Sequence, residues 1–185
     1  MSSGKRYRLE VGQVIADAML DFMGNVCERI EVAGSIRRKK EDVGDVEIVC
    51  IPKVHRLQQN MFGVADGPME TPLYNRLRSE EWLSPRLIDG KPQAMGKRFL
   101  ALYDNKIGIP VDVFVVLPPA QWGVIMTFRT GSADFNKKLL SAARRRNLRC
   151  EDGHLVNGTK IIQTPTEESF FEAVGVSWVP LEQRG

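Results

Sequence analysis

Apolar residues recur along the chain with helical spacing in some stretches and in short continuous runs in others. Over residues 11–22 they fall three and four positions apart, and Gly24-Asn25 follow as a stop signal, so the pattern predicts a helix. The short apolar runs predict strands. These runs cover residues 31–34, 43–51, 98–103 and 111–117.

Glycine and proline residues divide the chain. Gly63, Gly67 and Pro68 interrupt one irregular stretch. Thr71-Pro72 then matches an N-cap with proline at the first helical position, so a helix is expected to about residue 83. Residues 118–119 are both proline and form the clearest boundary, because two successive prolines cannot continue a central strand. We therefore expect an α+β protein, with a mostly β lobe over residues 1–117 and a smaller mixed lobe over residues 118–185.

The second lobe is predicted to contain two helices. Residues 124–128 are expected to be extended, and Ser132 is a natural N-cap for a helix that runs to about Arg146. Residues 164–167 match a capping box with proline at the first helical position, which opens a last helix that ends near Gly175. Turn signals with short strands around them stand at residues 152–153 and 157–158.

Composition is that of an ordinary globular protein, with 43% hydrophobic and 26% charged residues. The net charge of +3 does not by itself indicate a nucleic-acid partner, but positive charge is concentrated in two places. One is the run at residues 37–40. The other, between residues 136 and 150, contains no acidic residue and could contact a phosphate backbone, although a solvated helix face is the simpler explanation. Its basic residues are Lys137, Lys138, Arg144, Arg145, Arg146 and Arg149.

The cellular location is predicted from the absence of targeting and membrane-spanning segments in the sequence. No apolar run approaches the roughly 18 residues of a membrane span, and no signal-peptide core is visible. The three cysteines, Cys27, Cys50 and Cys150, are widely separated and are expected to be reduced thiols. We expect no membrane association and a location in the cytoplasm of a bacterium or of a phage-infected host.

Three carboxylates interrupt apolar strands. Asp45 and Glu47 stand two positions apart, so both project from one face of their strand, and Asp112 lies in a second apolar strand. If the two strands are neighbours, the three carboxylates meet, and their repulsion favours a hard divalent cation such as Mg²⁺. Two such ions about 3.5–4 Å apart can serve phosphoryl transfer. An exposed edge strand is the alternative explanation for Asp45 and Glu47 taken alone.

The loop before these carboxylates has the residues of an anion site. Gly34 permits close approach of the backbone, and Ser35 can open a helix whose free N–H groups point at a phosphate. Arg38 adds a charged donor. Gly-Ser pairs are common, but this one is followed ten residues later by the Asp-x-Glu pattern. Together these motifs predict a nucleotidyltransferase.

These residues resemble a known family. Gly34-Ser35-Ile36-Arg37-Arg38 with Gly44-Asp45-Val46-Glu47 resembles the Gly-Ser-x-Arg-Arg and Gly-Asp-x-Asp motifs of the family X DNA polymerases. Residues 128–132, Phe-Arg-Thr-Gly-Ser, and residues 135–137, Phe-Asn-Lys, resemble two further motifs of that family in the same order. The resemblance begins near Glu31 and reaches the closing segment, so it covers most of the chain.

The resemblance implies a palm domain over residues 1–117, a nucleotide- and template-binding lobe over residues 118–185, and the following roles. The metal ligands and catalytic residues, for two Mg²⁺ ions with Mn²⁺ as a substitute, would be Asp45, Glu47 and Asp112. The triphosphate of the dNTP would contact Gly34, Ser35, Arg38 and Gly44. The sugar and base of the incoming dNTP would contact Phe128, Arg129, Gly131 and Asn136. The resemblance places Lys137 near the templating base, and the basic run adds Lys138, Arg144 and Arg145 as candidate DNA contacts.

Several positions depart from the family pattern. Glu47 replaces an aspartate, Phe128 lacks a tyrosine hydroxyl, and Arg129 stands where an aromatic residue is common. Pro110 and Leu140 stand where the best-known member of this family has arginines. These changes bear on metal geometry, sugar discrimination and template dependence.

The resemblance thus implies a monomeric DNA-directed DNA polymerase that adds a dNMP to a primer 3′-hydroxyl in short-patch repair or end synthesis. With only about 30 residues before the first motif, it is expected to be a reduced form similar to small viral members. Two alternatives remain. One is a nucleotidyltransferase of the same superfamily that acts on an RNA end, a protein or a small molecule, or as a template-independent terminal transferase. The other is a non-catalytic nucleic-acid-binding module.

Overall fold

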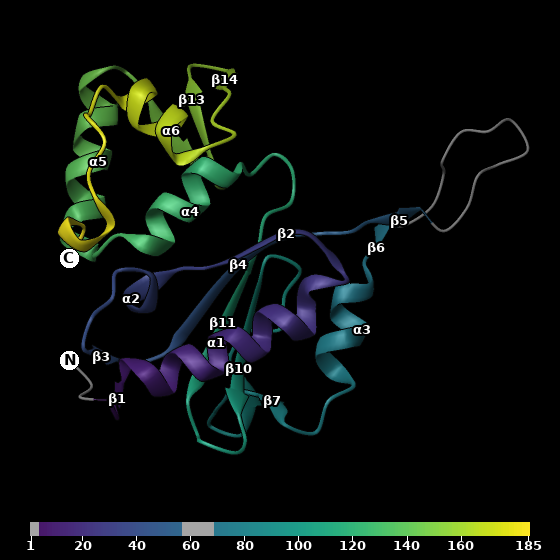
Figure 1. Ribbon diagram of the computed structural model, residues 1–185. Coiled ribbons are helices and arrows are strands. Elements are labelled where there is room, and N and C mark those ends of the chain that lie inside the picture. Colours follow the sequence, from purple (N-terminus) through teal and green to yellow (C-terminus); the bar gives the residue numbers. More distant parts are fainter. Residues whose placement is uncertain (1–3, 57–68) are drawn as a thin grey trace, which may run out of the picture.

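The computed structural model describes residues 4–56 and 69–185, so the predicted breakers Gly63, Gly67 and Pro68 lie outside the described residues. The chain forms an α+β fold, as the sequence predicts, and we describe its elements as a first and a second lobe (Figure 1). The first lobe is built on a five-stranded sheet, and the second combines three α-helices with a three-stranded sheet. No helix in the described part of the chain is long and apolar enough to cross a membrane.

The five-stranded sheet has the order β2-β4-β11-β10-β7. Only the central pair β4–β11 is parallel, and every other pair is antiparallel. The strands are β2 (Cys27–Val32), β4 (Val46–Pro52), β11 (Pro110–Val115), β10 (Phe99–Asp104) and β7 (Leu83–Pro85).

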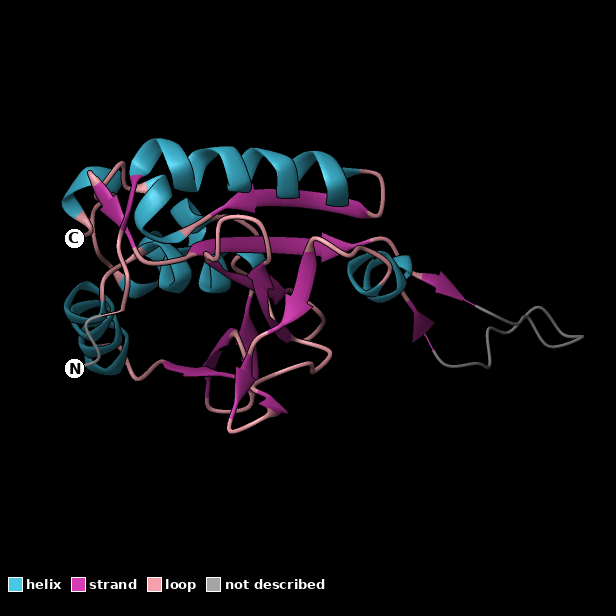
Figure 2. Ribbon diagram, turned by 90° about the horizontal axis from the view of Figure 1, so that it is seen from below, coloured by secondary structure: helices cyan, strands magenta, loops and turns pink. Residues whose placement is uncertain are grey.

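Helix α1 (Leu9–Gly24) covers one face of this sheet, as Figures 1 and 2 show from two directions. Its buried residues Ile15, Met19 and Met23 pack into the same core as alternate residues of the two central strands. These are Val46, Ile48 and Cys50 in β4 and Val111, Val113 and Val115 in β11. Because side chains alternate along a strand, Glu47 and Asp112 must face the other way.

Short elements complete the first lobe. They are β1 (Tyr7–Arg8) paired with β3 (Asp42–Val43), α2 (Gly34–Arg37), β5 (His55–Arg56) paired with β6 (Met69–Glu70), α3 (Pro72–Arg78), and the hairpin of β8 (Leu87–Ile88) and β9 (Lys91–Pro92). Thr71 is the N-cap of α3 as predicted, with its side chain accepting a bond from the Leu73 N–H, but the helix ends at Arg78 rather than near residue 83.

The prediction of an extended segment at residues 124–128 is wrong. These residues lie in helix α4 (Trp122–Thr130). Their β-branched and aromatic side chains suit a strand, but burial with helical spacing, at Trp122, Met126 and Thr130, decides the conformation. Gly123 lets the helix approach the segment around Thr166 closely, because a β-carbon at position 123 would overlap the Thr166 carbonyl oxygen.

The rest of the second lobe follows the predicted order. Ser132 caps helix α5 (Ala133–Arg145) by accepting a bond from the Phe135 N–H at 3.2 Å. The turn signals separate β12 (Arg149–Glu151), β13 (His154–Asn157) and β14 (Lys160–Ile162). Helix α6 (Glu167–Val174) and the 3₁₀ turn η1 (Leu181–Gln183) close the chain.

The last helix starts two residues later than predicted. Its N-cap is Thr166 rather than Thr164, and the capping box pairs Thr166 with Ser169 rather than Thr164 with Glu167. Glu167 is therefore the first residue of the helix, and its carboxylate is free to bind elsewhere. The predicted end near Gly175 is confirmed, since Gly175 adopts the left-handed conformation that ends a helix.

Candidate active site

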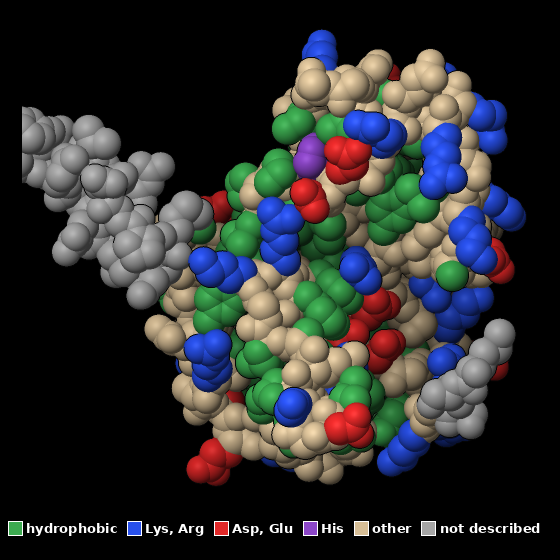
Figure 3. Space-filling model, turned by 180° about the vertical axis from the view of Figure 1, so that it is seen from behind, with side chains coloured by type: hydrophobic (Ala, Val, Ile, Leu, Met, Phe, Trp, Pro, Cys, Tyr) green, Lys and Arg blue, Asp and Glu red, His purple; other side chains and the backbone are tan. Residues whose placement is uncertain are grey.

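The parallel pairing of β4 and β11 places Asp112 directly opposite Glu47. Both side chains lie on the face of the sheet that α1 does not cover. Further along the strands, Val49 and Phe114 occupy this face and pack against Trp122 and Met126 of α4. The carboxylates thus lie where the apolar contact between the lobes gives way to polar side chains. Figure 3 shows acidic side chains grouped near the middle of this face, with Lys and Arg side chains beside them.

Asp45 approaches the same place from a different element than predicted. The strand expected over residues 43–51 is divided into β3, which ends at Val43, and β4, which starts at Val46. Asp45 stands in the break between them, so strand alternation does not by itself set its direction. Its charge nevertheless raises the pKa values of both Glu47 and Asp112, and we refer to the three residues as the carboxylate cluster.

The electrostatics of the cluster disfavour three negative charges. Burial is the main cause that raises the pKa of Glu47 to about 8, and the Asp45 carboxylate adds to it. Burial also raises the pKa values of Asp45 and Asp112. Arg129 and Arg38 act in the opposite direction on Glu47. The cluster is therefore short of positive charge, as expected where a cation binds.

Arg86, which sequence reasoning did not select, supplies one of the nearby charges. Its Nη2 lies 2.7 Å from Oδ1 of Asp112, and the two side chains are only 21% and 14% exposed. The two groups therefore form an ion pair that is largely shielded from solvent. No motif marks Arg86, and only the sheet order, which brings its segment beside β10 and β11, places it there.

The donor chemistry of the cluster fits magnesium, because its side chains offer carboxylate oxygens. The arrangement does not yet form a metal site: among residues 4–56 and 69–185, no three His, Cys, Asp or Glu side chains are grouped so as to hold an ion. Asp112 Oδ1 already lies 2.7 Å from a guanidinium nitrogen of Arg86, so the feature that favours a cation is the mutual repulsion of the carboxylates, which adds to the rise in the pKa values of Glu47 and Asp112. The arginine contact on that same oxygen has to change before an ion binds.

The Gly34-Ser35 loop wraps around Glu47. Gly34 has φ +62°, and a β-carbon there would overlap the Glu47 carboxylate, so glycine is required by conformation and by space. Gly34 and Ser35 are the first two residues of α2, which has only four residues and Ala33 as its N-cap. Ser35 is half-buried in this turn, whereas Gly44 lies beside Arg6 across the loop.

Arg38 links this loop to the second lobe. Its Nη1 donates to the Thr130 carbonyl oxygen at the end of α4, whereas its buried Nε has no hydrogen-bond partner among the described residues. Burial lowers its pKa, and the negative charges of Glu47 and Asp45 oppose that effect. Arg38 therefore stands between the carboxylates and the second lobe with one donor unused.

The turn between α4 and α5 gathers the residues predicted to meet a nucleotide. Asn136 Nδ2 donates to the carbonyl oxygens of Phe128, at 2.7 Å, and Gly131, at 3.3 Å, while its Oδ1 has no partner. A β-carbon on Gly131 would lie 2.5 Å from that Oδ1. Arg129 stacks on the ring of Phe114, with 3.8 Å between its guanidinium carbon and the ring centre. The α4–α5 turn is thus held by hydrogen bonds from the Asn136 side chain to backbone carbonyl oxygens.

A buried charge cluster, the Arg37–Glu167–Arg184 clasp, joins the lobes. Glu167 Oε2 lies 2.7 Å from Nη2 of Arg37, and its Oε1 lies 2.6 Å from Nη1 of Arg184, whose side chain is fully buried. Arg37 also donates to Oγ1 of Thr130 at 2.9 Å. The position of the Gly34-Ser35 loop therefore depends on α4 and α6 of the other lobe.

The basic residues of α5 share its outer face. Lys137, Lys138, Arg144 and Arg145 are all exposed, whereas Leu139 and Ala143 are buried. Spacings of seven and eight residues return to the same side of a helix, so the four cations form one stripe. Only Lys137 among them has an ion-pair partner in the described part of the chain, Asp134 at 3.0 Å.

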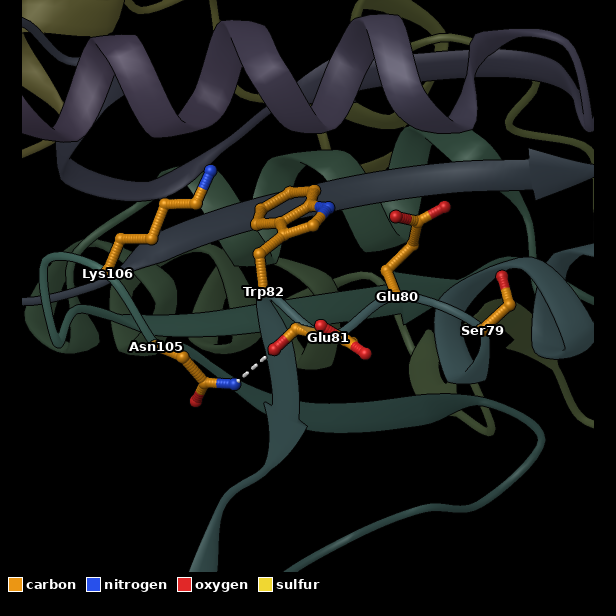
Figure 4. Close-up of a pocket in the computed structure, with 6 residues that line it drawn as sticks. All are labelled: Ser79, Glu80, Glu81, Trp82, Asn105 and Lys106. Carbon is orange, nitrogen blue, oxygen red and sulfur yellow. Dashed lines mark hydrogen bonds between the residues drawn. The ribbon is translucent and has the colours of Figure 1, made fainter.

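Two surface hollows lie away from the carboxylates. One lies at the start of β7 near the β10–β11 turn, where Asn105 donates to the Glu81 carbonyl oxygen at 2.8 Å (Figure 4). Its lining is Ser79, Glu80, Glu81, Trp82, Asn105 and Lys106. A second hollow, lined in part by Arg146 and Ile162, lies in the second lobe. Neither contains a residue predicted for catalysis.

Comparisons with known proteins show a similarity to DNA polymerases. Residues 125–185 match the family model of the DNA polymerase beta thumb. DNA polymerase lambda from Rattus norvegicus is 24% identical over 161 residues, which cover 78% of this chain and 26% of the rat protein. The chain is similar to the family X DNA polymerases. It spans about a quarter of the length of the relative it matches. The match to the thumb of a family X polymerase covers α5, α6 and most of α4, the elements that bear the basic stripe and part of the clasp.

Proposed function

We propose that this protein is a DNA-directed DNA polymerase that transfers a dNMP from a dNTP to a primer 3′-hydroxyl with release of pyrophosphate. The observation that carries the proposal is the register of the parallel pair β4–β11, which sets Asp112 opposite Glu47 beneath the Gly34-Ser35 loop. The similarity to family X polymerases supports DNA as the partner.

Each group near the cluster has a chemical task in this proposal. Asp45, Glu47 and Asp112 would hold two Mg²⁺ ions, with Mn²⁺ as a substitute, and the ions would stabilise the attacking and leaving oxygens. Arg38, with its unused Nε, would bind a phosphate oxygen together with the Gly34-Ser35 loop. The α4–α5 turn would hold the nucleotide by shape, because only glycine fits at position 131 next to Phe135 and Asn136. The protein thus contributes positioning and electrostatics.

The basic stripe of α5 is proposed to bind the DNA backbone. Four exposed cations on one face, of which three lack an ion-pair partner in the described part of the chain, can neutralise phosphates. The remaining alternative is a nucleotidyltransferase that acts on an RNA end, a protein or a small molecule, since the carboxylate cluster alone does not select the acceptor.

Primer extension with Mg²⁺ tests the proposal, using gapped, recessed and single-stranded DNA side by side. We expect extension by the wild type, none by Asp112→Ala, and full extension by Asp17→Ala, an exposed aspartate on α1. DNA binding should persist in Asp112→Ala. Undiminished extension by Asp112→Ala would refute the site. Consumption of NTPs without DNA extension would favour another acceptor, and DNA binding without any turnover would favour a non-catalytic module.

A further inference from the structure

Two arginines reach the carboxylate cluster from different lobes. Arg86 belongs to the first lobe and contacts Asp112 at 2.7 Å, and Arg129 belongs to α4 of the second. Arg129 lies over the ring of Phe114, which is two residues beyond Asp112 and therefore on the same face of β11. The cluster is thus bordered by guanidinium groups from two sides.

The position of Arg86 is fixed by its backbone and by its side chain. Its N–H donates to the Ala101 carbonyl oxygen at 2.8 Å, and its own carbonyl oxygen accepts from the Gln93 N–H at 2.7 Å. Its Nε donates to Oε1 of Gln93. These bonds hold the guanidinium at the root of the β8–β9 hairpin, so the contact with Asp112 is part of the fold rather than a chance surface pair.

Both arginines act on Asp112, while Arg38 and Arg6 add their charges at Asp45 and Arg38 also acts on Glu47. The Arg86 charge acts on Asp45 and Asp112, and the Arg129 charge acts on Glu47 and Asp112. Together they offset part of the repulsion between the three carboxylates, whose pKa values nevertheless stay raised. A guanidinium at hydrogen-bonding distance from Asp112 Oδ1 also excludes an ion from that oxygen, both by space and by like charge.

We propose that Arg86 is a built-in counterion of Asp112, supported by Arg129, and that a divalent ion enters the cluster only by displacing Arg86 from Asp112. This inference rests on the proposed metal-dependent function. It implies that the free protein binds divalent ions weakly. A bound nucleotide would strengthen the binding of the ion, because its phosphates bring further oxygen ligands for the ion and an anionic partner for the released guanidinium.

Mn²⁺ binding to the protein without nucleotide or DNA tests the proposal, because free Mn²⁺ is measured directly by electron paramagnetic resonance. We expect Arg86→Gln to bind Mn²⁺ about tenfold more tightly than the wild type, since a nearby unit charge that repels the ion is removed. Arg86→Lys keeps the charge and should stay near the wild-type affinity. The matched control is Arg98→Gln, which removes an exposed charge just before the neighbouring strand β10.

Gln93→Ala is a second variant that leaves Arg86 in place but removes the partner of its Nε, and it should tighten Mn²⁺ binding in the same direction. Equal Mn²⁺ affinity for wild type, Arg86→Gln and Gln93→Ala overturns the inference, as does an equal gain in Arg98→Gln. The outcome is separate from the proposed function: tighter Mn²⁺ binding by Arg86→Gln with no primer extension by the wild type would uphold the counterion and reject the polymerase.

Discussion

Glu167→Gln should destabilise the protein more than any ordinary surface substitution, because it removes the one negative charge between two arginines. Glu167 is 6% exposed, and its two oxygens lie 2.6 Å from Arg184 and 2.7 Å from Arg37. Arg184 has no exposed side-chain surface and would be left as a buried charge. Loss of one partner of a buried ion pair costs about 3–5 kcal/mol.

The expected loss lies at the lower end of that range. A glutamine oxygen can still accept one bond, Arg37 is 19% exposed and keeps some solvation, and Arg184 retains its bond from Nε to the Val179 carbonyl oxygen at 2.9 Å. About 3 kcal/mol corresponds to a fall in melting temperature of roughly 6–12 °C for a chain of this size.

Thermal denaturation followed by circular dichroism measures the effect, with Glu168→Gln as the control. Glu168 is the next residue of α6, lies in the same first turn and is exposed, so both variants lose the same interaction with the helix dipole. We expect Glu168→Gln to stay within about 0.5 kcal/mol of the wild type. Equal melting temperatures for the two variants would show that the clasp contributes nothing to stability.

Two further results are expected. The metal-free protein should lose stability as pH rises from about 4.5 towards about 8, because folding favours the protonated form of Glu47, whose pKa is raised to about 8. Glu47→Gln should flatten the pH dependence of the melting temperature, and parallel curves for the two proteins would contradict this. In a salt titration of DNA binding, Arg144→Ala/Arg145→Ala should lower the slope by about 0.9 for each phosphate that is no longer neutralised. An unchanged slope would place the DNA surface elsewhere.

The central strands that carry Glu47 and Asp112 were predictable because their signals are local, whereas the strand expected over residues 31–34 forms as β2 over Cys27–Val32. Alternation in β4 and β11 separates Glu47 and Asp112 from the core valines, and the fold class follows from the order of the elements. Helix α4 was not predictable from propensity, since its β-branched and aromatic residues suit a strand and only burial against its neighbours selects the helix. The N-cap of the last helix was predicted two residues too early, because both Thr164 and Thr166 are residues that can cap a helix.

The charge contacts around the site could not be predicted because they join distant parts of the chain. Arg37 and Glu167 are 130 positions apart, and no spacing rule connects them. Arg86 meets Asp112 only through the order of strands in the sheet. The metal-ligand prediction for Asp45, Glu47 and Asp112 stays a prediction, and so do the roles of the nucleotide- and DNA-contacting residues.

The register of β4 against β11 limits which deletions the protein can tolerate. A one-residue deletion in β11 ahead of Asp112 would turn Asp112 towards α1 and turn Val113 outward, so a charge would enter the core as a valine left it. Such a frame-preserving deletion would remove the fold and the chemistry together. In a deletion scan of this strand, inactive but well-folded variants should therefore be rare, and loss of soluble expression should report loss of the site.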